Sequence, residues 1–398
     1  MSSSPRTPSR TGKYKVAIVL KQVLASFVRA YREDRQHRTP RASPHSSGPS
    51  VTYLDMDDTA KPRRTLHLEA SCVEELAKQY QAKNLLNEEN NARFVDHIDF
   101  VRNFEARAGT EGVGYRVMRA QFFANNEGMD RDLSDLFRVT FPPTHNAVDA
   151  RPSALIETTD PGATNVLESL KTDGYWVSPV RVPDAILANV MPPFDQTVHE
   201  TPGRDMVDEA LLMQNRQIMD LWVDSFFLKI AERFFESAPI LDFVVGMITN
   251  AGDTSAIKMS QDAMYYHSDK DRIRWLKAFI YLDDVGLDNG PHTYIAASQR
   301  RRLISRDGRY SDAEVRSVSP PGSEKVVTGP RGTFFLADTS CLHKGSIVRA
   351  GVRRVLQFEW TNSLFGAALH KVPMSVYRQQ GVSTAFVEKY PRLFQRFV

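Results

Sequence analysis

Residues 264–297 read MYYHSDKDRIRWLKAFIYLDDVGLDNGPHTYIAA. Aromatic and branched apolar residues fill 274–282 and again 292–297, and both runs have the length of a β-strand. The sequence DNGP at 288–291 is a turn signal between the two runs. This part of the chain is therefore predicted to be β-structure, with His267 and Asp269 just before its first strand.

Further strands are predicted on both sides of this stretch. After Pro239 the apolar residues change from a helical to a strand-like spacing, and strands are expected at 241–249, 325–328, 332–337 and 353–361. Short strands joined by turns that contain Gly and Pro are typical of a sandwich, a barrel or a jelly roll.

Before Pro239 the sequence is mainly helical in pattern. A helix is expected to end at Asp173 and Gly174, a short strand to occupy 175–178, and a further helix to begin at Pro183 and Asp184. Residues 205–237 are interpreted as one long helical run, because apolar residues recur along it at helical spacing. Packing against the core accounts for this apolar stripe.

The chain divides by composition into four parts. Residues 1–50 carry ten Lys and Arg against two acidic residues, whereas 51–398 carry 41 basic and 46 acidic residues. The positive charge thus belongs to the N-terminal segment, so no nucleic-acid partner is expected for the folded part. We predict a disordered, basic and amphipathic segment over 1–50, a helical extension over 51–160, a core of β-strands over 161–375 and a C-terminal helix over 376–398.

The rest of the composition limits the compartment and the partners. The 398 residues contain only Cys72 and Cys341, which form no disulfide framework and no CxxC motif, so a reducing compartment is expected. No apolar run is long enough for a transmembrane helix. We expect a cytoplasmic protein, with targeting to an organelle through the basic N-terminal segment as the alternative. The sequence is compatible with a homo-oligomer.

The sequence contains two His-x-Asp pairs, and only in the pair His267 and Asp269 does this spacing suit a shared metal ion. His97 and Asp99 have the same spacing, but they lie in a predicted helix, where residues two apart diverge by about 200°. On an extended segment the same spacing directs both side chains to one face. We therefore select His267 and Asp269 as metal ligands.

A mononuclear iron site of the facial type needs two imidazoles and one carboxylate. The second imidazole is expected from a distant strand, and His343 ends the predicted strand in GTFFLADTSCLHKGS, 74 residues after Asp269. Ten positions later, Arg353 begins RRVLQFEW, where a guanidinium could hold a carboxylate through two parallel hydrogen bonds.

Five segments together resemble the phytanoyl-CoA dioxygenase-like family of Fe(II)/2-oxoglutarate oxygenases. They are LKTDGYWV, YYHSD, FIYLDDVGLDNGPHTYIAASQRR, GTFFLADTSCLHKG and RRVLQFEW, within residues 165–365. The resemblance implies an α+β fold, a double-stranded β-helix (a cupin-like jelly roll) with backing helices. It also implies Fe(II), 2-oxoglutarate and O2 as cofactor and co-substrates, with His267, Asp269 and His343 as the catalytic iron ligands and Arg353 on the far carboxylate of 2-oxoglutarate.

Arg354 is the alternative to Arg353, because family members often have a longer step from the distal histidine to the arginine. Adjacent strand residues point to opposite faces, so only one arginine can enter the barrel. Leu356, Phe358 and Trp360 share the parity of Arg354 and suit packing beneath helices. Arg353 is therefore selected.

The substrate is expected to be a small molecule, free or linked to CoA or a carrier protein, of the kind used in secondary metabolism. Candidates for its contacts are Tyr265, Trp275, Phe279 and Tyr281, whereas His292 is interpreted as structural. Because Asp269 is a carboxylate where halogenating relatives have a small residue, hydroxylation is the leading reaction. The alternatives are a non-oxidative cupin-type isomerase or lyase, and a jelly-roll binding module without catalysis.

Overall fold

The computed structural model of the chain describes residues 134, 141, 143, 153–156, 160–197, 204–251, 265–300, 303–304, 308–364, 372–375 and 384–397. Within these ranges we find no helix with the length and apolar character of a membrane span. The predictions for residues 1–50 and for most of 51–160, including His97 and Asp99, lie outside the described residues.

Two antiparallel sheets form the centre of the fold. The larger sheet has the order β1-β7-β4-β9-β3-β2 and the smaller one the order β6-β5-β8. The strands of the larger sheet are β1 (Tyr175–Val177), β2 (Arg204–Val207), β3 (Ile240–Asn250), β4 (Trp275–Tyr281), β7 (Phe334–Ala337) and β9 (Val352–Thr361). Those of the smaller sheet are β5 (His292–Ile295), β6 (Glu324–Val327) and β8 (His343–Gly345). The predicted strands are confirmed, apart from small shifts at their ends.

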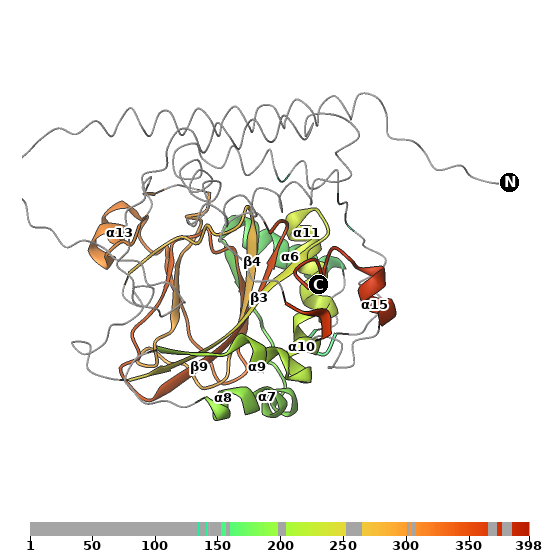
Figure 1. Cartoon of the computed structure of the whole chain (residues 1–398). Coiled ribbons are helices and arrows are strands. Elements are labelled where there is room, and N and C mark those ends of the chain that lie inside the picture. The colour runs from blue at the N-terminus through green and yellow to red at the C-terminus, as the bar shows by residue number, and fades with distance from the viewer. Residues whose placement is uncertain are drawn as a thin grey trace, which may run out of the picture.

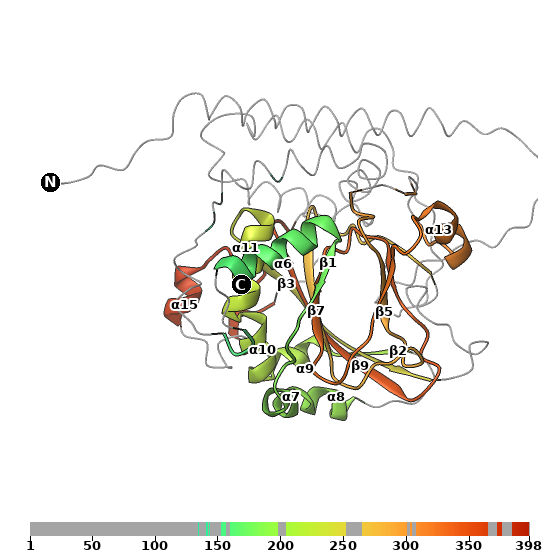
Figure 2. The same ribbon diagram turned by 180° about the vertical axis from the view of Figure 1, so that it is seen from behind.

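Helices cover one face of the larger sheet, as Figures 1 and 2 show from opposite sides. The helices are α6 (Asp160–Thr172), α7 (Asp184–Val190), α8 (Pro192–Gln196), α9 (Glu209–Met213), α10 (Arg216–Trp222), α11 (Ser225–Phe235), α13 (Asp312–Val318) and α15 (Thr384–Lys389). α13 lies apart from the others, beside the smaller sheet. The arrangement confirms the expected α+β double-stranded β-helix with backing helices.

The two faces of the larger sheet contribute to different apolar clusters. On β9, Leu356, Phe358 and Trp360 are buried in the cluster that includes α10 and α11, whereas Val355 belongs to a cluster between the sheets. Strand alternation accounts for this division, because successive side chains point to opposite faces. The predicted packing of these three residues beneath the helices is therefore confirmed, and Arg353 has the parity of the face between the sheets.

The prediction of one helical run over 205–237 is wrong. β2 occupies its start, and the rest is divided into α9, α10 and α11. The side-chain oxygen of Asn215 accepts a hydrogen bond from the backbone N–H of Ile218 (3.0 Å), and that of Asp224 accepts one from Phe226 (2.9 Å). Each side chain caps a new helix and satisfies an N–H that has no partner within the helix, so the chain turns at these points without losing hydrogen bonds.

A buried network of charges joins the C-terminal segment to the loop before β4. The guanidinium of Arg272 donates to both carboxylate oxygens of Asp242 (2.8 and 3.1 Å), and the indole N–H of Trp275 donates to the same carboxylate (2.7 Å). Arg396 donates to the backbone carbonyl of Asp242 and to both carboxylate oxygens of Glu209 (2.7 Å each). The loop that carries His267 and Asp269 is thus anchored just beyond its end.

Candidate metal centre

Backbone pairing brings His267 beside His343, although 76 positions separate them in the sequence. The backbone N–H of each residue donates to the carbonyl of the other at 2.9 Å, and the N–H of Asp269 donates to the carbonyl of Thr339 at 2.8 Å. The two imidazole rings lie 4.3 Å apart, centroid to centroid. The loop before β4 is therefore held against β8, with its side chains directed between the sheets.

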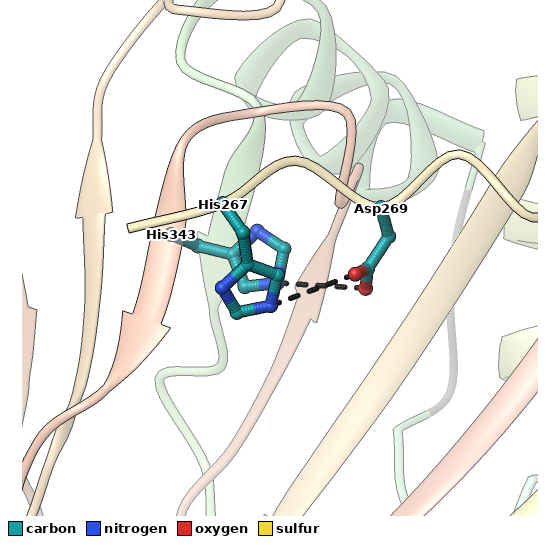
Figure 3. A group of neighbouring side chains, drawn as sticks. All are labelled: His267, Asp269 and His343. Atoms are coloured by element: carbon teal, nitrogen blue, oxygen red, sulfur yellow. Dashed lines mark ion pairs between the residues drawn. The ribbon is translucent and has the colours of Figure 1, made fainter. Parts of the chain in front are cut away.

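The three predicted ligands converge on one point (Figure 3). Nε2 of His267 lies 3.5 Å from Oδ1 of Asp269, and Nε2 of His343 lies 3.5 Å from Oδ2. One ligand atom from each of the three side chains lies within 4.8 Å of the others. Both imidazoles are buried, and 19% of the Asp269 side chain is exposed.

The surroundings of both rings suit metal ligation through Nε2. Nδ1 of His267 lies 3.2 Å from the carbonyl oxygen of Tyr265, and Nδ1 of His343 lies 2.8 Å from that of Cys341. A neutral ring that donates its Nδ1–H to such a carbonyl keeps the Nε2 lone pair for a metal, and the carbonyl fixes the ring orientation. Two imidazoles and one carboxylate are the donor set of non-haem Fe(II) oxygenases, so the residues fit this metal.

Asp269 has a second neighbour, which the sequence analysis missed. The ammonium of Lys277, on β4, lies 2.9 Å from Oδ2 of Asp269 and 3.2 Å from Oε1 of Glu359 on β9. Burial would raise the pKa of Asp269, but Lys277 and then His343 and His267 hold this pKa well below its usual value. Burial raises the pKa of Glu359 to about 7, against the opposing effect of Lys277.

The two candidate arginines differ in environment. Arg353 is 3% exposed, and its Nε and Nη1 have no hydrogen-bond partner among the residues that the structure describes. Burial is the main cause that lowers its pKa to about 10; Tyr281 opposes this shift and Arg204 adds to it. Arg354 donates from Nε and Nη2 to the carboxylate of Asp283 at 3.1 and 2.8 Å, on the other face of the strand. Of these two arginines, Arg353 is therefore the one available for a carboxylate between the sheets.

Residues 184–355 match the family model described as phytanoyl-CoA dioxygenase. This part of the chain is thus similar to that family. The resemblance predicted from the sequence is thereby confirmed, and so is the enzyme class, an Fe(II)/2-oxoglutarate-dependent oxygenase. No curated protein matches the chain.

Several solved structures are also similar to the chain. AviO1 from Streptomyces viridochromogenes Tue57 has 15% identity and a TM-score of 0.39, with 53% of this chain and 100% of AviO1 covered. The non-haem epimerase SnoN from nogalamycin biosynthesis has 14% identity and a TM-score of 0.41, with 51% and 82% covered. HygX from Streptomyces hygroscopicus, with nickel and 2-oxoglutarate bound, has 15% identity and a TM-score of 0.37, with 49% and 85% covered.

The four candidate substrate contacts lie in different places. Phe279 and Tyr281 are buried between the sheets, and the Phe279 ring lies 4.5 Å from that of His292. Trp275 donates to Asp242 and lies beneath the Lys277 ammonium, 3.9 Å from it. Tyr265 is 36% exposed. Their part in substrate binding stays a prediction.

Proposed function

We propose that the chain hydroxylates a C–H bond of a small-molecule metabolite and converts 2-oxoglutarate to succinate and carbon dioxide in the same reaction. His267, Asp269 and His343 would hold Fe(II), and Arg353 would bind the far carboxylate of 2-oxoglutarate. The observation that carries this proposal is the convergence of these three donors beside a buried guanidinium without a partner among the described residues.

Each protein group has a distinct task in this reaction. The imidazoles of His267 and His343 and the Asp269 carboxylate would hold Fe(II), a donor set that leaves room on the metal for the co-substrate and oxygen. Bound Fe(II) would supply the activation of oxygen. Arg353 orients the keto acid, because a guanidinium and a carboxylate form two parallel hydrogen bonds. Phe279, Tyr281 and Phe335 surround this region with apolar surface, which strengthens the ion pair by excluding water.

The carboxylate at position 269 favours hydroxylation. Halogenating relatives have a small residue there, and the position left open on the metal takes the halide. In this chain Asp269 is present, with the Lys277 ammonium 2.9 Å from Oδ2, and its carboxylate would hold the metal where a halide would otherwise bind. The substrate is proposed to be a small metabolite, free or linked to CoA or a carrier protein.

The test measures succinate release by the purified chain with Fe(II), 2-oxoglutarate and a library of small metabolites. We expect iron-dependent succinate formation, increased by the true substrate and accompanied by a product heavier by one oxygen atom. Asp269→Ala is the matched variant; without halide it should retain less iron than the parent chain and form no hydroxylated product. Metal binding without consumption of 2-oxoglutarate would favour an isomerase or lyase, and a chain that binds no metal would favour a non-catalytic module.

A further inference from the structure

Buried polar atoms gather beside Arg353, on the inner faces of β3, β5 and β9. Besides Nε and Nη1 of Arg353, they are Oγ1 of Thr249 and Nε2 of His292, and in the described part of the chain none of them has a hydrogen-bond partner. A buried polar atom without a partner costs free energy, so native proteins satisfy nearly all of them. Several such atoms in one place therefore indicate a polar ligand.

His292 lies between the metal centre and Arg353. Its ring stacks on that of His343, with 5.8 Å between centroids and 14° between planes. His292 is also the cross-strand partner of Gly345 on β8, and a Cβ added to Gly345 would lie 3.4 Å from Nη2 of Arg353. One side of the His292 ring is thus next to the metal ligands, and its strand neighbour is next to the guanidinium.

Thr249 reaches the same place from β3. It is the register partner of Arg353 on β9, so the two side chains leave neighbouring strands on the same face. Thr249 is 2% exposed. Its hydroxyl therefore lies next to the Arg353 side chain, shielded from solvent.

We propose that His292 and Thr249 bind the far carboxylate of 2-oxoglutarate together with Arg353. This inference rests on the proposed function. A carboxylate accepts about four hydrogen bonds and the Arg353 fork supplies two, so an imidazole N–H and a hydroxyl can satisfy the remaining lone pairs. The co-substrate would in turn give each of these atoms the partner that it lacks within the described residues.

The experiment compares two keto acids on the Ni(II)-loaded chain by calorimetry, in which no turnover occurs. 2-Oxoglutarate has the far carboxylate and pyruvate lacks it. We expect His292→Leu to weaken 2-oxoglutarate binding about tenfold or more, since a hydrogen bond to a charged group is lost. Thr249→Val should weaken it several-fold. Pyruvate and Ni(II) should bind each variant as they bind the parent chain, and His292→Gln, which keeps an N–H donor, should recover much of the loss.

Thr293→Val is the matched control. Thr293 is a neighbour of His292 on β5, and its hydroxyl is 3.0 Å from that of Ser346 on the other face of the strand. This variant should bind 2-oxoglutarate normally. Unchanged 2-oxoglutarate affinity in the His292 and Thr249 variants would overturn the inference. An equal loss of pyruvate affinity would also overturn it, because it would show that His292 acts on the keto-acid end that both ligands share. If His292→Leu fails to fold, the 2-oxoglutarate affinities of Thr249→Val and His292→Gln test the inference instead. A parent chain that binds no 2-oxoglutarate would instead contradict the proposed function.

Discussion

Replacing Lys277 with Met should destabilise the metal-free chain strongly and make it depend on metal. The ammonium lies 2.9 Å from Asp269 and 3.2 Å from Glu359, and these side chains are 19% and 5% exposed. At an effective dielectric constant of about 20, each contact corresponds to a Coulomb energy of about 5–6 kcal/mol before the cost of desolvation. Removing one partner of such a buried group costs about 3–5 kcal/mol, because the other charges stay buried.

We expect the lower end of this range, about 3 kcal/mol, because Glu359 can take up a proton when the ammonium is removed. For a domain of this size, that loss lowers the melting temperature by roughly 6–12 °C. A divalent metal restores positive charge beside Asp269, so the metal should raise the melting temperature of Lys277→Met by more than that of the parent chain.

The assay is thermal unfolding followed by circular dichroism, with chelator and then with excess Ni(II). Lys325→Met is the control, because Lys325 is an exposed lysine on β6. Lys325→Met should have the melting temperature of the parent chain under both conditions. If metal-free Lys277→Met melts within a degree or two of the parent chain, or if the metal stabilises both equally, Lys277 is not the charge partner of Asp269.

Three further outcomes are expected. His267→Ala should abolish iron retention, measured by metal analysis, whereas His97→Ala should leave it unchanged; the reverse result would reject the choice of ligand pair. Arg353→Leu should raise the KM for 2-oxoglutarate at least tenfold, because a charge-assisted pair is lost, whereas Arg354→Leu should leave this KM near the parent value and lower stability slightly through its contact with Asp283. The pKa of Glu359 is about 7 in the native state, against a usual value of 4.5. Between these two pH values the native state keeps the proton and the unfolded state releases it. The free energy of unfolding should therefore fall, by up to about 3 kcal/mol, as the pH rises from 4.5 to 7. Denaturant unfolding of the metal-free chain at several pH values checks this, and Glu359→Gln should lose most of that slope.

The strands could be predicted from the sequence because one physical pattern defines them. In 274–282 and 353–361, inward and outward side chains differ in character, and Gly and Pro mark the turns. The region 205–237 was misinterpreted because Asn215 and Asp224 interrupt an apolar spacing that fits a helix throughout. A polar residue within such a pattern is as compatible with an exposed helix position as with a cap, and only the backbone conformation separates the two.

The candidate site shows the same limit. His267, Asp269 and His343 could be selected because two of them have a spacing that demands an extended segment and the third follows a strand. Lys277, Glu359 and Thr249 could not, because their approach depends on which strands are neighbours and on how far each side chain extends. One signal was available: Lys277 is a lone charge at an inward position of an aromatic and aliphatic strand, and a buried charge needs a partner.

The hydrogen bonds of Arg396 limit how the C-terminal residues of this chain can be modified. Its guanidinium clamps Glu209 and the peptide carbonyl of Asp242, and Asp242 in turn fixes Arg272, three positions after Asp269. Trimming the last few residues, or fusing a bulky tag directly to them, would therefore disturb iron loading from a distance. A purification handle belongs at the opposite terminus.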